Sequence, residues 1–131
     1  MSWCFQDETN DYAVAIRQSM RRNTARVPAI WPYEVANVLI VGERRGRLTR
    51  ENSMRFLALI SALPIEIDPF AHIREASSIL EVAGTANLSA YDAAYLDLAM
   101  RSNLPLATLD ARLSAVAPGL GVRLFTLPSP A

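Results

Sequence analysis

Residues 88–112, LSAYDAAYLDLAMRSNLPLATLDAR, decide how the chain is organised. The first part of this stretch predicts a helix. Ser89 stands three residues before Asp92, which is typical of a capped helix start, and the alanines and leucines that follow are strong helix formers. Asn103 and Pro105 indicate where the helix ends, because neither residue continues a helix well. The stretch therefore contributes one helix that begins beside an acidic residue.

A short buried strand is expected directly after this helix. Residues 104–109 are mostly apolar, as in strands of a parallel sheet that is covered on both faces. Asp110 follows this run, where a second, short helix is expected to begin. The carboxylates of Asp92 and Asp110 are thereby placed around one strand end.

Length and composition indicate one compact domain. With 131 residues, of which 51% are hydrophobic, the chain is long enough to bury one sizeable core. We expect this domain to span residues 1–127 and the short tail, residues 128–131, to be frayed. The formal net charge is zero, with 13 acidic and 13 basic residues. Any attraction to a nucleic acid must therefore come from a local basic patch.

The basic residues and the cysteine content narrow the possible chemistry. All 13 basic residues are arginines, so mechanisms that need a catalytic or phosphate-binding lysine are excluded. Cys4 is the single cysteine and cannot form an internal disulfide. The sequence shows no charged and apolar leader and no apolar run of about 18 residues that could enter a membrane. The cytoplasm is therefore the expected location.

Helices and strands are expected to alternate along the rest of the chain. Pro32 favours the first turn of a helix, Gly46 its left-handed end, and Thr49 the start of the next helix. The expected helices cover residues 8–22, 32–46, 50–62 and 69–83, with Gly84 directly after the last of them. The expected strands cover residues 26–30, 65–67 and 122–127. This alternation predicts an α/β protein, a three-layer α/β/α sandwich around a mostly parallel sheet.

Acidic residues fall at the carboxyl ends of two of the expected strands. Glu34 comes shortly after residues 26–30, and Asp110 comes after residues 104–109. In parallel sheets this edge carries the ligand site. Glu34, Asp92 and Asp110 also stand in first helical turns, where acidic residues cap helices or favour the helix dipole. A purely structural role therefore stays open for each of them.

The lack of neighbouring positive charge favours a metal site over three separate helix caps. No arginine lies within four residues of Glu34, and only Arg112 is near Asp110. Three carboxylates at one sheet edge would repel and raise one another's pKa unless a hard divalent ion joined them. Oxygen ligands of this kind favour Mg²⁺ or Mn²⁺ over zinc.

Other acid-rich or nucleophilic sites find little support in the sequence. The GxxxxGK motif of phosphate-binding loops, the DxDxT motif of haloacid-dehalogenase-like phosphatases and the lysine of receiver domains are absent. His72 is the single histidine and is expected at the surface of the helix over residues 69–83. Cys4 has aromatic neighbours and no histidine near it in sequence, so we interpret it as a core residue rather than a nucleophile.

Three other polar residues lie near the candidate acids in sequence. Asn37 follows Glu34 by one helical turn and is expected either to orient a metal ligand or to satisfy a backbone group. Thr108 is expected either to form a hydrogen bond at the strand end or to be a β-branched strand residue. Asp97 follows Asp92 by five residues, which turns it away from that face, so we leave it out of the site.

Positive charge is concentrated in one stretch of the chain. This stretch contains Arg44, Arg45, Arg47, Arg50 and Arg55. Two interpretations stay open. The arginines are either a solvated helix end whose charge suits the helix dipole, or a lip that contacts RNA phosphates.

Three segments carry a resemblance to a known family. They read WCFQDE, WPYEVANVLIVGERRGRLT and LSAYDAAYLDLAMRSNLPLATLD. Over nearly the whole chain, the sequence resembles PIN-domain proteins of the VapC toxin family. The resemblance implies a Mg²⁺- or Mn²⁺-dependent endoribonuclease that leaves 5′-phosphate and 3′-hydroxyl ends, a VapB-like antitoxin as partner, and a homodimer. By position in the motifs, it implies that Glu34, Asp92 and Asp110 are catalytic, metal-binding residues.

The chain departs from that family at its N-terminus. Family members begin with a central strand that ends in an aspartate, the fourth acidic residue of their site, and this sequence starts after that position. We expect either that Met1 is an internal methionine of a longer natural chain, or that the chain is a truncated remnant. A remnant implies a second possible function, that of a catalytically inactive PIN scaffold that binds an antitoxin or self-associates.

Overall fold

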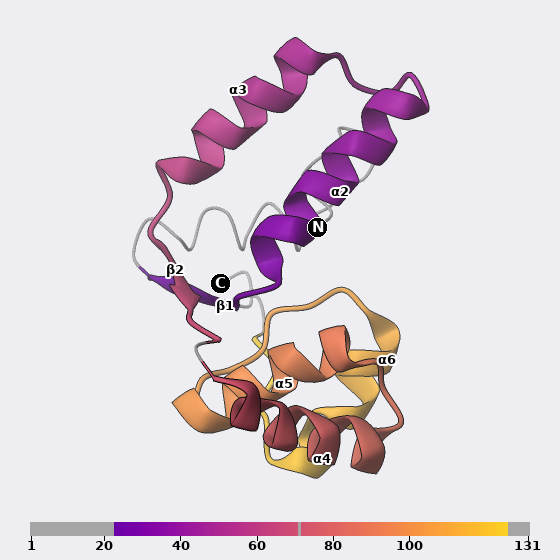
Figure 1. Ribbon diagram of the computed structural model, residues 1–131. Helices are drawn as coiled ribbons and strands as arrows, with labels where there is room; N and C mark the ends of the chain where they lie inside the picture. Colours follow the sequence, from indigo (N-terminus) through magenta and orange to yellow (C-terminus); the bar gives the residue numbers. More distant parts are fainter. Residues whose placement is uncertain (1–22, 71, 126–131) are drawn as a thin grey trace, which may run out of the picture. The chain divides into compact units, whose positions relative to one another are not determined.

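The computed structural model of the protein describes residues 23–70 and 72–125 (Figure 1). The chain divides into two compact units. Of the described residues, the first unit contains 23–26 and 30–67, and the second contains 27–29, 68–70 and 72–125. Each unit is built on its own helices.

Two helices, α2 (Trp31–Arg44) and α3 (Arg50–Ser61), make up most of the described part of the first unit (Figure 1). Pro32 occupies the first turn of α2, where its missing N–H leaves no helical hydrogen bond unmade. Gly46 follows the end of α2 at φ +73°, a backbone conformation that glycine adopts without strain. Both positions confirm the predicted limits of this helix.

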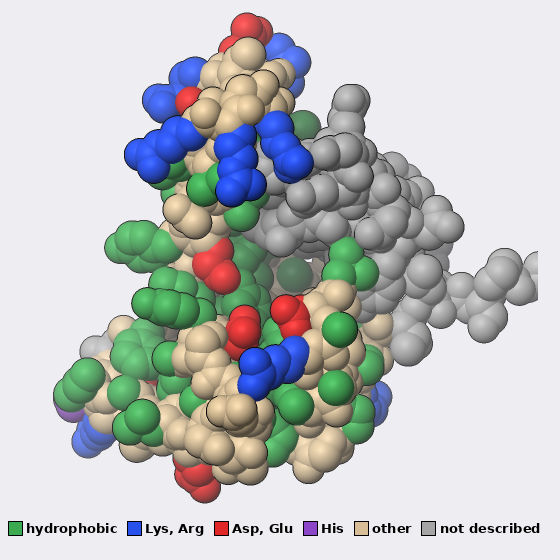
Figure 2. Space-filling view, turned by 90° about the vertical axis from the view of Figure 1, so that its right-hand side faces the viewer, with side chains coloured by type: hydrophobic (Ala, Val, Ile, Leu, Met, Phe, Trp, Pro, Cys, Tyr) green, Lys and Arg blue, Asp and Glu red, His purple; other side chains and the backbone are tan. Residues whose placement is uncertain are grey.

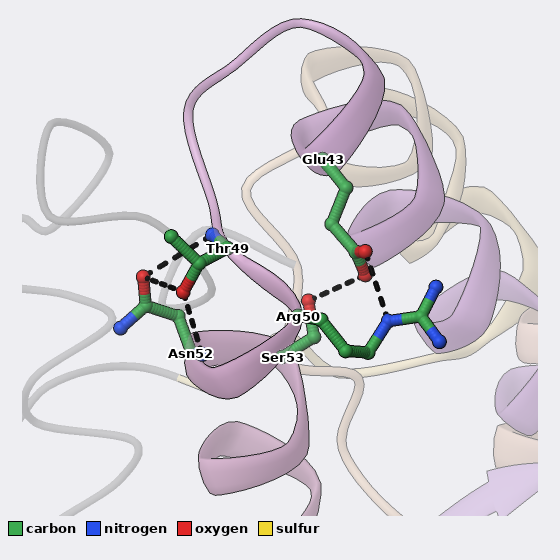
Figure 3. Close-up of polar contacts among 5 residues, drawn as sticks. All are labelled: Glu43, Thr49, Arg50, Asn52 and Ser53. Atoms are coloured by element: carbon green, nitrogen blue, oxygen red, sulfur yellow. Dashed lines mark hydrogen bonds and ion pairs between the residues drawn. The ribbon is translucent and has the colours of Figure 1, made fainter.

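The turn between α2 and α3 is closed by side chains from both helices (Figure 3). Thr49 caps α3, since its Oγ1 accepts the backbone N–H of Asn52 at 3.0 Å while Oδ1 of Asn52 accepts the backbone N–H of Thr49 at 3.2 Å. The Glu43 carboxylate accepts hydrogen bonds from Nε of Arg50 at 2.9 Å and Oγ of Ser53 at 2.8 Å. The predicted cap at Thr49 is confirmed, and the turn is fixed from both sides.

Two short strands, β1 (Ala25–Pro28) and β2 (Ile65–Asp68), form a two-stranded parallel sheet. The backbone N–H of Ala25 donates to the carbonyl of Pro64 at 3.0 Å at the start of the pair. Pro28 is the last residue of β1, a position where a missing N–H interrupts no ladder of hydrogen bonds. The structure therefore confirms the two strands that the sequence predicts near residues 26–30 and 65–67.

The second unit consists of short helices around one apolar core. Helix α4 (Ala76–Ala86) packs against α5 (Ala90–Ser102), and α6 (Ala111–Val116) follows them in the chain. Two 3₁₀ helices, η3 (Ile73–Glu75) and η4 (Pro118–Leu120), precede α4 and follow α6. The buried core side chains are Val82, Ala93, Leu96, Ala99, Leu106, Leu113, Ala117 and Val122. Each large side chain in this core stabilises the unit by about 1.5–3 kcal/mol.

The helix predicted over residues 69–83 differs from the structure at both ends. It begins later, because η3 comes before α4, and it ends later, because Gly84 lies inside α4. Asn87, at φ 54°, provides the left-handed residue that ends α4. Asparagine tolerates this conformation almost as glycine does, so the prediction of Gly84 as the helix end was wrong.

Residues 104–109 do not form the predicted strand. Leu106 makes an isolated parallel bridge with Leu124, and its backbone N–H donates to the carbonyl of Arg123 at 2.8 Å. Leu106 is buried, whereas Leu109 is 49% exposed. The prediction of a strand covered on both faces was therefore wrong, because within the described residues this segment pairs through an isolated bridge. The strand predicted over residues 122–127 was wrong in its described part for the same reason, since residues 122–125 contribute the bridge residue Leu124 and no strand.

Some predictions fall outside the described residues. These concern the helix over residues 8–22, the end of the strand over residues 122–127, the tail over residues 128–131 and the burial of Cys4. The absence of a first central strand and the single domain over residues 1–127 also stay predictions. None of the helices in the described part of the chain combines the length and the apolar character needed to cross a bilayer.

Candidate functional site

Asp92 lies in the first turn of α5, and a side chain fixes its backbone. Oγ of Ser89 accepts the backbone N–H of Asp92 at 3.2 Å, as the sequence predicts. The next residue, Ala93, and Leu96 one turn later are completely buried, so this end of α5 is anchored in the core. The Asp92 carboxylate itself is half-buried and forms no hydrogen bond or ion pair within the described residues. A well-anchored backbone thus presents a carboxylate whose oxygens are not used by this part of the protein.

Asp110 is the N-cap of α6, and only one of its carboxylate oxygens serves that purpose. Oδ1 accepts the backbone N–H groups of Arg112 at 2.9 Å and of Leu113 at 3.0 Å. Oδ2 accepts no hydrogen bond from the described residues. The Asp110 backbone N–H donates to Oγ1 of Thr108 at 3.0 Å, which confirms the expected hydrogen bond of that threonine. The cap orients the carboxylate and leaves its second oxygen available.

The cation closest to Asp110 in sequence does not neutralise it. The guanidinium of Arg112 donates a hydrogen bond to the backbone carbonyl of Asn87, the residue that ends α4. Within the described residues, neither Asp92 nor Asp110 takes part in an ion pair. The two acids therefore have no fixed positive partner in this part of the chain.

Glu34 lies in the first turn of α2, next to the buried Val35, and is half-buried. It belongs to the first unit, whereas Asp92 and Asp110 belong to the second. Among residues 23–70 and 72–125, no three His, Cys, Asp or Glu side chains are grouped so that they could hold a metal ion. A joint site of the three acids therefore stays a prediction. Asn37, one turn after Glu34, is exposed, and its metal-orienting role also stays a prediction.

A carboxylate that the sequence analysis left aside has a clear role in the second unit. Asp97 is 7% exposed, and its Oδ2 accepts Nε of Arg101 at 2.8 Å. Nη2 of the same guanidinium donates to Oδ2 of Asp68 at 3.0 Å. The hydrogen bond to Asp97 is the main cause that raises the pKa of Arg101. The (i, i+4) spacing of Asp97 and Arg101 signals this pair, but the contact with Asp68 spans 33 residues and cannot be read from sequence.

The single histidine is a capping residue. His72 precedes η3, and its Nδ1 accepts the backbone N–H of Arg74 at 3.3 Å. The expected surface position is confirmed, but the residue lies before the helix on which it was placed. Within the described part of the chain, the hydrogen bond of His72 is to a backbone N–H and not to a serine or cysteine side chain.

The chemistry of the candidate donors suits a hard divalent cation. Asp92 offers two carboxylate oxygens, and Asp110 offers one oxygen beyond its capping bond. Carboxylate oxygens are the ligands that Mg²⁺ and Mn²⁺ prefer. Each aspartate therefore has an oxygen of the kind that such an ion binds, beyond the hydrogen bonds that position its backbone or its capping oxygen.

Comparisons with known proteins agree with the fold and the chemistry. Residues 1–118 match the PIN domain family. Among solved structures, the chain is similar to PAE2754 from Pyrobaculum aerophilum, with a TM-score of 0.65 and 28% sequence identity over 82% of this chain and 80% of that one. A search of curated proteins gives no match. PIN domains are generally nucleases, act on RNA and generally use divalent metal ions. The predicted α/β class is confirmed as the PIN fold.

Proposed function

The chain belongs to the PIN domain family, and from this premise we propose that it is an endoribonuclease that depends on Mg²⁺ or Mn²⁺. The observation that carries the proposal is the state of the Asp92 carboxylate. Its backbone is fixed by Ser89, yet neither of its oxygens is used within the described residues. A carboxylate held in place without a protein partner is what a metal ligand requires.

Each acid has a defined part in the proposed reaction. Asp92 and the second oxygen of Asp110 would hold the metal ion, and Glu34 would be the third ligand by its place in the family motif. When bound there, the ion would supply Lewis-acid chemistry for the hydrolysis of a phosphodiester. Ser89 and Thr108 keep the backbone before each aspartate fixed, so the carboxylates need little reorganisation when the ion arrives. The expected products carry 5′-phosphate and 3′-hydroxyl ends.

We further assign the chain to the VapC type of toxin, neutralised by a VapB-like antitoxin and active as a homodimer. The similarity of the segments WPYEVANVLIVGERRGRLT and LSAYDAAYLDLAMRSNLPLATLD to that type supports this assignment. Expression of the wild-type chain should arrest bacterial growth, whereas the Asp92→Asn variant at equal protein level should not. Growth arrest by both variants would contradict a toxic activity that depends on this acid.

Metal binding is tested by thermal unfolding with and without Mn²⁺. A ligand that binds the folded chain stabilises it by about 2.7 kcal/mol at a hundred times its Kd, so the melting temperature should rise. The rise should disappear in Asp92→Asn. Glu81→Gln is the matched control, because it removes an exposed carboxylate of α4 and should leave the rise intact. An equal rise in both variants would contradict the assignment of Asp92.

The same experiment separates the proposed enzyme from the inactive PIN scaffold that the sequence leaves open. If the chain is an inactive scaffold, Mn²⁺ or Mg²⁺ should not change the melting temperature of the wild-type chain, and the chain should bind the antitoxin tightly. If the chain is the proposed enzyme, the metal should raise the melting temperature only when Asp92 is present. The wild-type chain should also cleave RNA in the same buffer.

A further inference from the structure

The turn between α2 and α3 carries a local excess of positive charge. Residues 43–55 contain five arginines and two glutamates, in a chain whose formal net charge is zero. Figure 2 shows arginine side chains gathered over this end of the two helices. We call residues 43–55 the arginine turn.

Two of the five arginines are neutralised within the arginine turn. Nε of Arg50 lies 2.9 Å from Oε1 of Glu43, and Nη2 of Arg55 lies 3.0 Å from Oε1 of Glu51. Arg44 and Arg45 are exposed, and within the described residues their guanidinium groups form neither hydrogen bonds nor ion pairs. The positive charge available to a partner therefore lies mainly at the end of α2.

The backbone that carries Arg44 and Arg45 is held by a series of hydrogen bonds. Three backbone N–H groups donate to backbone carbonyls of α2. The N–H of Arg45 donates to the carbonyl of Val41 at 3.0 Å, that of Gly46 to the carbonyl of Glu43 at 3.1 Å, and that of Arg47 to the carbonyl of Gly42 at 2.9 Å. The bond from Ser53, which is 3% exposed, to Glu43 ties this end of α2 to α3 (Figure 3). A preformed turn loses little conformational entropy when it binds.

The composition of the arginine turn fits a nucleic acid better than a protein. Protein interfaces have an apolar centre, whereas nucleic-acid interfaces are polar and positively charged. Among the described residues, Met54 is the one exposed large hydrophobic side chain inside the turn, and Ile40 and Leu57 are exposed beside it. Leu48, inside the turn, is half-buried.

We propose that the arginine turn binds the phosphate backbone of single-stranded RNA, with Arg44 and Arg45 as the contacting groups and Arg50 and Arg55 as structural ones. The choice of RNA rests on the proposed nuclease function. Binding through phosphates carries no base preference, so this surface contributes affinity rather than sequence selectivity.

The test compares two double variants that remove the same net charge. Binding of a labelled single-stranded RNA of about 20 nucleotides is measured by fluorescence anisotropy in EDTA, across a series of salt concentrations. Arg44→Ala with Arg45→Ala should lower the slope of log affinity against log salt by about 1.4, which is about 25-fold weaker binding at about 0.1 M salt. Arg50→Ala with Arg55→Ala should lower it by less than half as much. Lysine at both positions 44 and 45 should restore most of the slope.

Four results would overturn the proposal. These are equal losses in the two double variants, no loss in Arg44→Ala with Arg45→Ala, no RNA binding by the wild-type chain, and displacement of RNA by poly-glutamate as effectively as by unlabelled RNA. The last would indicate an acidic protein as the partner. The binding assay contains no metal, so a wild-type chain that binds through Arg44 and Arg45 but cuts no RNA with Mn²⁺ would contradict the proposed nuclease alone.

Discussion

Oδ1 of Asp110 accepts the backbone N–H of Leu113 at 3.0 Å and so closes the first turn of α6. A carboxylate has two oxygens, and the second of this pair is not used within the described residues. The sequence presents helix capping and metal binding as competing interpretations of Asp110. In the structure they are compatible, because each needs a different oxygen of the same group.

Substitutions at Asp110 should separate these two roles. Asp110→Asn keeps an oxygen that can cap α6, so the free energy of unfolding should change by less than about 0.5 kcal/mol. Asp110→Ala removes the cap and should cost about 1 kcal/mol. Both variants should lose metal-dependent RNA cleavage. Urea unfolding and a cleavage assay on the same preparations check this, and an Asn variant that cleaves like the wild type would contradict the metal role.

Replacing Ser89 should lower the stability of the fold and leave metal binding intact. Its hydroxyl caps α5 and accepts the N–H of Asp92, so Ser89→Ala should lower the free energy of unfolding by about 1 kcal/mol. Ser89→Asp restores an N-cap acceptor and should recover most of the loss. The Mn²⁺-dependent rise in melting temperature should persist in both variants, since Asp92 is still present. Loss of that rise in Ser89→Ala alone would show that the cap is needed to place the carboxylate.

Arg101 should be important for the stability of the second unit. Arg101→Met leaves the buried Asp97 without its cation, and an unpaired buried carboxylate costs about 1–3 kcal/mol. Arg55→Met is the control, because Arg55 and its partner Glu51 are both exposed and such pairs contribute about 0–1 kcal/mol. Chemical denaturation of the two variants compares them. Equal losses would mean that the burial of Asp97 does not matter.

Glu43 should make stability depend on pH in the acidic range. Hydrogen bonds from Ser53 and Arg50 hold the pKa of Glu43 below its usual value. A lowered pKa in the folded state means that this group stabilises the fold above the usual glutamate pKa of about 4.3, and that the contribution is lost as pH falls through the lowered value. The stability difference between the wild type and Glu43→Gln should therefore shrink between about pH 6 and about pH 3. A difference that grows on acidification would contradict the hydrogen bonding at Glu43.

The local parts of the fold could be predicted from the sequence because short-range rules fix them. Thr49, Ser89 and Asp110 begin helices by hydrogen bonds to residues two or three positions away, and Gly46 follows a helix with a positive φ. Such contacts depend on a few neighbouring residues, which the sequence displays directly.

Contacts between segments that are far apart in the chain could not be predicted from the sequence. Residues 104–109 have the apolar composition of a strand, but strand formation depends on partners elsewhere in the chain, and here one bridge to Leu124 is present. Gly84 has the expected residue type for a helix end, yet packing against α5 continues α4 to Asn87. The pairing of Arg101 with Asp68 likewise depends on tertiary structure.

The central proposal is that Glu34, Asp92 and Asp110 are all required for a divalent-metal nuclease activity, and RNA cleavage tests it most directly. The rate of cleavage of a labelled RNA is measured with Mn²⁺ for the wild type, for Glu34→Gln, Asp92→Asn and Asp110→Asn, and for Glu81→Gln as the control. We predict that the wild type and the control cleave equally, that EDTA stops both, and that each of the three site variants is slower by at least about 100-fold. Cleavage at the wild-type rate by any one of the three site variants would contradict the claim.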